Sequence, residues 1–137
     1  MTYNAHATAL VNLLDADNNP PALVVIAGKV PPGMLPPYVR VYVHVEDPDD
    51  AESRPITGAS QRVVARAICH CVGGDDIAAR AVAQRVRAAY LDVVPTVAGR
   101  VCLPIRHEAS NPPVDDESTG TLVVDQVDTY RLESLPA

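Results

Sequence analysis

The sequence predicts a single α+β domain over residues 1–137, built on a mixed, mostly antiparallel sheet of four to five strands with two main helices packed on one face. Three observations lead to this fold class. Hydrophobic residues make up 47% of the chain but include neither Trp nor Phe, so a core rich in β-branched side chains favours a substantial sheet. Residues 39–45 alternate between apolar and polar side chains. Residues 60–94 join a strand-like run to an amphipathic helix through Gly73 and Gly74.

The N-terminal part of the chain predicts a helix, a short strand and a stiff loop. Residues 4–14 have helical spacing, with Asn4 available as the N-terminal cap. The apolar positions of this helix are Ala7, Leu10, Val11 and Leu14. Asp, Asn and Pro in residues 15–21 stop it. Residues 23–27 predict a short strand, and two Pro-Pro pairs stiffen the loop 29–37 into extended conformations. This loop either connects two strands or contacts a partner at low entropic cost.

The clearest strand of the sequence is residues 39–45, VRVYVHV. Its valines form one apolar face, which we expect to pack on the helices. Arg40, Tyr42 and His44 form the other face, which solvent, a channel or another subunit could contact. The following segment, residues 46–56, is acidic and polar without periodicity, so we expect an exposed loop.

Residues 60–94 are the stretch around which the rest of the chain is organised. An extended run places Val64, Ile68 and Val72 on one side and small residues on the other. Those small residues are Ala65, Ala67, Cys69 and Cys71. After the glycines, Asp75 or Asp76 can cap a helix that continues to about Val94, where Pro95 ends it. We expect its packing stripe to comprise Ala78, Val82, Val86, Ala89 and Val93, with Arg80, Gln84 and Arg87 pointing away from the sheet.

The C-terminal part predicts two more strands. Residues 99–106 place Val101, Leu103 and Ile105 on one face, and Pro104 makes this an edge or irregular strand. Residues 107–120 read as a second acidic, Pro-bearing loop. Residues 121–132 predict the last strand, after which we expect a frayed tail.

Several residues have side chains that could perform chemistry. Cys69, His70 and Cys71 suggest a metal site at first sight, but in a strand His70 points away from both cysteines. Cys71 lies near a helix start, although Asp75 and Asp76 there oppose a reactive thiolate. The acidic pairs lie in predicted loops or at that helix start, and no phosphate-binding or nucleophile motif occurs. We therefore predict a protein that is not an enzyme, with no catalytic residue, cofactor or metal.

Charge and cysteine content restrict the partners. The net charge of −6 disfavours direct nucleic-acid binding, although an acidic wall along which DNA slides remains compatible with it. Three cysteines make no secreted disulfide framework, so we expect a reducing compartment. The N-terminus shows no signal peptide pattern, and the longest apolar run, residues 22–27, is too short to span a membrane.

Taken together, the helix, the Pro-rich loop, the strand VRVYVHVEDPDD, the strand-Gly-Gly-Asp-helix unit and the closing strand GTLVVDQVDTYRLES resemble tail terminator proteins of long-tailed bacteriophages. The resemblance covers nearly the whole chain and is one of layout. It implies a hexameric ring on the head-proximal end of the tail tube, which stops tube polymerisation and offers a docking surface to a head connector protein. DNA would pass through the ring without specific binding. The location implied is the virion, and the host cytoplasm during assembly.

A ring needs a heterologous interface between two different patches of the same subunit. We predict that these patches are Arg40, Tyr42 and His44 on one strand, and Arg80, Gln84 and Arg87 on the long helix. Two alternatives stay open at this stage. One is another head-tail connector or minor tail protein, and the other is a small metal- or thiol-dependent enzyme.

Overall fold

The computed structural model describes residues 2–17, 20, 22–46, 62–117 and 120–137. Within these residues, two helices and seven strands follow one another. Their order and bounds are α1 (Thr2–Asp15), β1 (Val25–Ile26), β2 (Tyr38–Glu46), β3 (Val63–Gly73), α2 (Asp76–Tyr90), β4 (Arg100–Cys102), β5 (Arg106–Ser110), β6 (Val114–Asp116) and β7 (Val123–Pro136). The predicted α+β class is confirmed.

All strands belong to one sheet with the order β1-β2-β3-β7-β4, and β5 and β6 also pair with β7. Every pairing is antiparallel except that of β1 with β2. The sheet is therefore mixed and mostly antiparallel, as predicted. The predicted count of four to five strands is wrong, because three short strands share the outer edge of β7 where one strand and a loop were expected.

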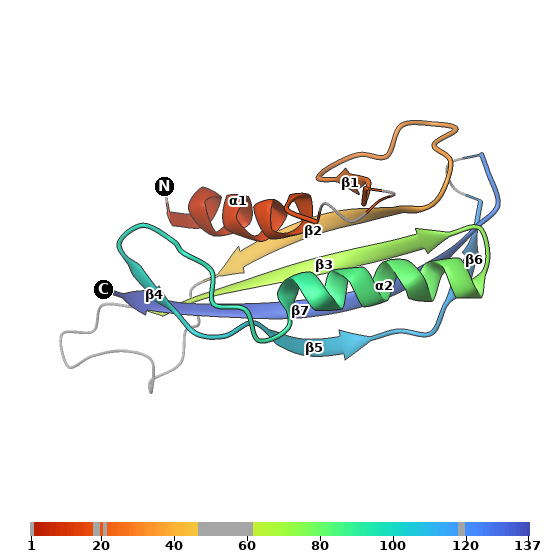
Figure 1. Cartoon of the computed structure of the whole chain (residues 1–137). Helices are drawn as coiled ribbons and strands as arrows, with labels where there is room; N and C mark the ends of the chain where they lie inside the picture. Colours follow the sequence, from red (N-terminus) through yellow and green to blue (C-terminus); the bar gives the residue numbers. More distant parts are fainter. Residues whose placement is uncertain (1, 18–19, 21, 47–61, 118–119) are drawn as a thin grey trace.

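Both helices lie along the same face of the sheet (Figure 1), which we call the closed face. Leu10 and Leu14 of α1 and Val86 of α2 pack there into one core with the small residues of β3. The valines of β2 that were expected to pack on the helices are part of this core or contact it, as predicted. Alternation along the strands sends the intervening side chains to the opposite face, which we call the open face.

Helix α2 begins as the sequence predicts and ends earlier. The Asp75 carboxylate caps it by accepting a hydrogen bond from the Ala78 amide at 2.8 Å. The helix ends at Tyr90, because Leu91 is extended and Asp92 has φ of +63°. Its buried residues are Ala79, Val82, Ala83, Val86 and Tyr90. Of the expected stripe, Val82 and Val86 are buried and Ala89 is partly buried against the core, whereas Ala78 is half-buried beside buried Ala79 and Val93 lies beyond the helix end.

Helix α1 starts at Thr2, so Asn4 lies inside it and the predicted cap at Asn4 is wrong. Leu10 and Leu14 are buried as expected, whereas Ala7 and Val11 are half-buried. His6 is fully buried, which its sequence context did not predict. Its Nε2 lies 2.7 Å from the Ser134 hydroxyl of β7, a contact that ties the first helix to the last strand.

The outer edge of β7 is covered in three separate pieces. The segment 107–120, predicted as a loop, contains β6 and most of β5. Pro104 and the pair Pro112-Pro113 lie in the gaps between β4, β5 and β6, where a missing amide donor breaks the ladder. The predicted common face of residues 101–105 is also wrong. Ile105 is fully buried, whereas Val101 and Leu103 are exposed, because no strand continues through Pro104.

Two further predictions meet the structure at the ends of the sheet. The tail expected to fray is the end of β7, which pairs with β4 as far as Pro136. The predicted strand 23–27 shortens to β1, and the loop after it closes over one end of the open face. There Ile26, Val30 and Met34 pack on Tyr38, Val72 and Val123. Residues 47–56 of the expected acidic loop lie outside the described residues, and Glu46 belongs to β2.

Candidate assembly surfaces

The predicted patch on β2 lies on the open face, where Arg40 and Tyr42 form a compact group. The Arg40 guanidinium lies 4.2 Å from the centre of the Tyr42 ring, and its Nε donates to the Gly28 carbonyl at 2.8 Å. The Tyr42 ring meets the His70 ring edge to face, with centroids 5.7 Å apart. His44, also on β2, lies further along the strand beside Glu46, at 3.7 Å. Stacking and a hydrogen bond thus hold Arg40 and Tyr42 in place, whereas the His44 side chain is 65% exposed.

A network of ion pairs continues across the open face. Arg66 on β3 contacts Glu46 on β2 and Glu108 on β5, the latter at 2.9 Å. Arg131 on β7 contacts the same Glu108 at 3.8 Å. Glu133 of β7 accepts from Arg131 and also from Arg62, at 2.7 Å for the second contact. Three arginines therefore share three carboxylates, and the side chains of these arginines are only 27–31% exposed.

These contacts shift the pKa values of Glu46 and Arg66 so that both side chains stay charged. A hydrogen bond from Arg66 lowers the pKa of Glu46 below its ordinary value of 4.5. The hydrogen bond to Glu46 in turn raises the pKa of Arg66, which keeps the guanidinium charged. An arginine neutralised by neighbouring carboxylates has little charge left to offer to a phosphate. The open face is therefore polar but poorly suited to gripping DNA.

His70 and Asp125 form a second polar pair on this face. The Nδ1 atom of His70 lies 2.8 Å from Oδ2 of Asp125. The other carboxylate oxygen of Asp125 is buried and accepts no hydrogen bond from the residues that the structure describes. Within the described residues this pair belongs to no group of three potential metal ligands, and a His-Asp pair alone supplies no nucleophile.

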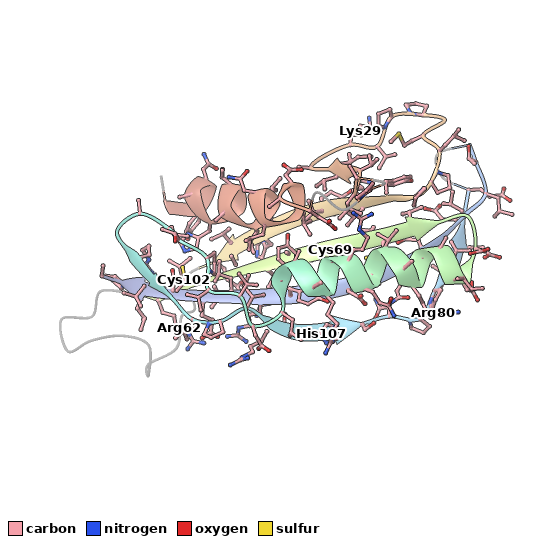
Figure 2. The ribbon with its side chains drawn as sticks, viewed as in Figure 1. Lys29, Arg62, Cys69, Arg80, Cys102 and His107 are labelled. Atoms are coloured by element: carbon pink, nitrogen blue, oxygen red, sulfur yellow. The ribbon has the colours of Figure 1, made fainter. Side chains whose placement is uncertain are left out.

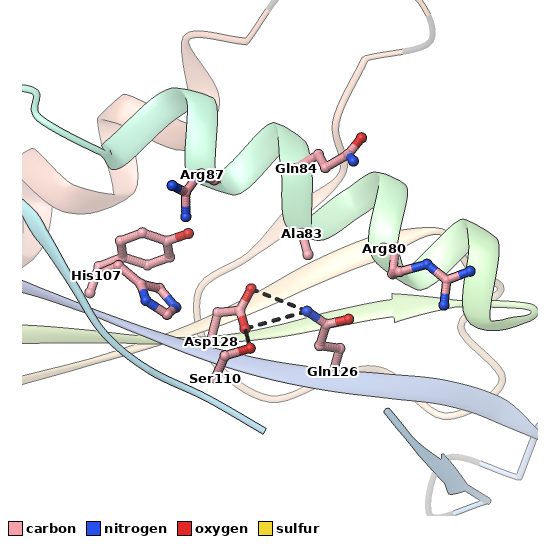
Figure 3. A pocket seen from close by; sticks show the side chains of 9 residues that line it. Arg80, Ala83, Gln84, Arg87, His107, Ser110, Gln126 and Asp128 are labelled. Atoms are coloured by element: carbon pink, nitrogen blue, oxygen red, sulfur yellow. Dashed lines mark hydrogen bonds between the residues drawn. The ribbon is translucent and has the colours of Figure 1, made fainter. Parts of the chain in front are cut away.

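The predicted patch on α2 lines a shallow groove between this helix, β5 and β7. Arg80, Gln84 and Arg87 are exposed along the helix, and the groove has a volume of about 260 Å³. Figure 3 shows Ser110 and Gln126 converging on Asp128 at the floor of the groove. Asp128 is only 5% exposed, and the Ser110 hydroxyl donates to it at 2.5 Å. Arg80 and Arg87 make no ion pair with any other residue that the structure describes.

The structure does not bring the two predicted patches together within one subunit. The β2 patch lies on the open face near one edge of the sheet, whereas the α2 patch lies on the closed face near the other edge. They point in different directions, as two halves of a heterologous interface must. Their pairing across a subunit boundary stays a prediction.

The cysteines, by contrast, are placed for packing. All three are free and buried, and Cys69 lies between the helices and the sheet, well away from Cys102 (Figure 2). Burial, with a smaller effect of the Asp128 charge, raises the pKa of Cys69 to about 12. Burial likewise raises the pKa values of Cys71 and Cys102. Such thiols are protonated at neutral pH and unreactive, and within the described part of the chain no group of three potential ligands could hold a metal ion.

Exposed apolar side chains gather at the two ends of the sheet. Ile77, Val114 and Leu122 are 71%, 58% and 59% exposed. Ile77 and Leu122 line a hollow of about 530 Å³ together with acidic residues. Val101 and Leu135 face each other at the opposite end of the sheet, at 54% and 45% exposure. Apolar patches bordered by polar residues are typical of surfaces that contact other proteins.

Comparisons with known proteins extend this description. No family model matches the sequence, and no match is found among curated proteins. A chain of a solved structure described as the virion of a native gene transfer agent particle has a TM-score of 0.69 and 20% sequence identity. The match covers 96% of this chain and 97% of that chain. A second solved structure, whose name describes no function, gives a TM-score of 0.63 at 21% identity over 100% of this chain and 98% of its own. The fold is therefore shared over the whole length.

Among the described helices, none is long and apolar enough to cross a membrane.

Sequence reasoning missed most of the open-face network. The alternation in residues 63–73 did place Arg66 and His70 on the face opposite the cysteines. The basic partner of each contact could therefore be predicted from the sequence. Glu108 gave no such signal, because it was assigned to a loop and its role depends on β5 pairing with β7.

Proposed function

We propose that this protein is a structural component of a phage-like virion that works by binding other protein subunits, without catalysis. The full-length fold match to a chain of a gene transfer agent virion is the observation that carries this proposal. The buried, protonated thiols and the ion-paired open face agree with it, because neither offers a reactive group. Exposed apolar patches at both ends of the sheet suit a subunit that contacts other proteins.

More specifically, we infer a tail terminator. Six copies form a ring at the head-proximal end of the tail tube, stop its polymerisation and provide the docking surface for the head connector. The partners are then copies of this chain, the tail tube protein and the head-tail connector protein, while DNA passes through the opening. The charge balance supports this passage, since the chain carries a net −6 and the open-face arginines are paired with carboxylates.

Electron microscopy of particles assembled without this protein tests the proposal. We expect overlong tails without heads, because tube subunits continue to add when nothing caps the tube. Supplying the wild-type chain from a plasmid should restore tails of normal length. Headless tails of normal length would instead favour a connector role, and normal virions would refute a structural role in tail completion.

A further inference from the structure

The outer edge of β2 is the longest uninterrupted strand edge in the described structure. The short strand β1 pairs only with Val39 and Arg40, so among the described residues only β3 pairs with residues 41–46. The pairing of β2 with β3 is regular, and residues 41–46 contain no Pro or Lys. Natural edge strands are normally protected by such residues or by bulges. An edge without this protection is suited to pairing with another chain.

Hydrogen bonding shows which groups this edge offers. The Val39 amide donates to the Val24 carbonyl at 2.9 Å, so the main-chain groups of Val39 point away from β3. In an antiparallel pair, the direction of these groups alternates from residue to residue. The amides and carbonyls of Val41, Val43 and Val45 therefore also point outward. They form a ladder ready to accept a further strand.

The opposite edge of the sheet is formed by β4, β5 and β6, of which β5 is the longest, and its five residues are all exposed. Because β2 and β7 both run antiparallel to β3, and β5 runs antiparallel to β7, β5 runs antiparallel to β2 within one subunit. A rotation about an axis along the strands preserves their direction. The β5 of a rotated neighbour would therefore meet β2 as an antiparallel partner.

Charges on the open face favour this direction. Strand β2 has Arg40 toward its start and Glu46 at its end, and β5 has Arg106 at its start and Glu108 further on. An antiparallel arrangement brings the basic end of each strand beside the acidic end of the other, whereas a parallel one brings like charges together. Opposite charges across neighbouring strands stabilise the pairing.

We propose that β2 of one copy pairs with β5 of the next copy, so that the ring closes through one continuous sheet. This inference rests on the proposed ring. Six copies that each contribute β2, β3, β7 and β5, at about 4.8 Å per strand, give a circumference of about 115 Å and a diameter of about 37 Å. A layer of helices about 10–12 Å across on the inside would nearly fill that space. The helices therefore lie outside, and the ion-paired open face lines the channel.

A cysteine pair tests this contact in tails and virions that contain the protein. His44→Cys is combined in turn with Arg106→Cys, Glu108→Cys and Ala109→Cys to cover neighbouring registers, and the particles are oxidised and separated under non-reducing conditions. The three native cysteines are buried, so we expect them to form no cross-link between copies. For at least one combination we expect a covalent ladder reaching six copies. His44→Cys alone should give none.

Each other outcome contradicts the proposal in a distinct way. Dimers from His44→Cys alone would indicate a two-fold β2–β2 contact. Rings of six copies without any cross-link would overturn the sheet contact and leave the proposed function standing. Particles in which the protein forms no ring would overturn both.

A proline variant measures the same contact independently. Val43→Pro removes an outward-pointing amide and leaves the hydrogen bonds from β2 to β3 in place. We expect the isolated subunit to keep its circular dichroism spectrum and to lose incorporation into particles. A folded Val43→Pro protein that still assembles would overturn the proposal, and if the variant does not fold, the cysteine pairs decide.

Discussion

The two faces of the sheet are built from the same strands and differ in what their side chains contact. On β3, Ala65, Cys69 and Cys71 are fully buried under the helices, whereas Arg66 and His70 on the other side remain partly exposed and contact carboxylates. Burial of apolar surface stabilises the fold, while part-exposed ion pairs contribute little because water solvates their charges. The closed face therefore contributes most of the apolar stabilisation, and on the open face such burial is concentrated at the end where Tyr38, Val72 and Val123 pack.

The largest difference should appear between two positions on β7. Leu132 is fully buried on the closed face, and Leu132→Ala is expected to lower the free energy of unfolding by about 2–5 kcal/mol. Thr129 lies on the open face, and Thr129→Ala should cost about 1 kcal/mol or less. Denaturant unfolding of both variants measures the contrast. Equal losses would mean that the open face also holds the fold together.

The junction of β3 and α2 offers a sharper test of close packing under the helices. A Cβ added at Gly73 would lie 2.3 Å from the Ala79 amide nitrogen, which is backbone that cannot move aside easily. Gly73→Ala is therefore expected to cost about 1–3 kcal/mol. Gly74 has open space around it, so Gly74→Ala should be close to neutral. Thermal unfolding of the two variants measures the difference. Equal midpoint temperatures for Gly73→Ala and Gly74→Ala would contradict the prediction.

The helix cap is expected to have the next largest effect. Asp75→Ala removes the acceptor for the Ala78 amide and should cost about 0.5–2 kcal/mol. Asp76→Ala, in the first turn, removes only a favourable charge near the helix N-terminus and should cost about 0.3–1 kcal/mol. Chemical denaturation compares the two. A larger loss for Asp76→Ala would show that the cap is not the main contact at this end.

The smallest effect is expected on the open face and depends on pH. Because Arg66 lowers the pKa of Glu46 in the folded protein, this pair stabilises the fold above pH 4.5 and loses that contribution as the pH falls through the lowered pKa. Arg66→Gln should raise the pKa of Glu46 toward 4.5, measured by NMR titration of its carboxyl carbon. Arg80→Gln, on α2, is the matched control and should leave that pKa unchanged. A Glu46 midpoint unaffected by Arg66→Gln would exclude the pair as its cause.

The sequence by itself determined the features that depend on near neighbours in the chain. Alternation over residues 39–45 separated the two faces of β2, and the Gly73-Gly74 pair identified the turn and limited the helix cap to Asp75 or Asp76. Such signals are readable because side-chain direction in a strand or helix follows from the position along that element alone. The same local logic placed Arg40, Tyr42 and His44 on one face and exposed Arg80, Gln84 and Arg87.

Only the tertiary structure decided which distant segments meet. Ile105 enters the core while Leu103 stays exposed, Ser134 pairs with buried His6, and Glu108 joins Arg66 across β7. Each of these features depends on β4, β5 and β7 pairing in one register. The partners in the His6–Ser134 and Arg66–Glu108 contacts lie 128 and 42 positions apart in the chain. No local pattern records such a register, because it is set by how the whole sheet packs against the two helices.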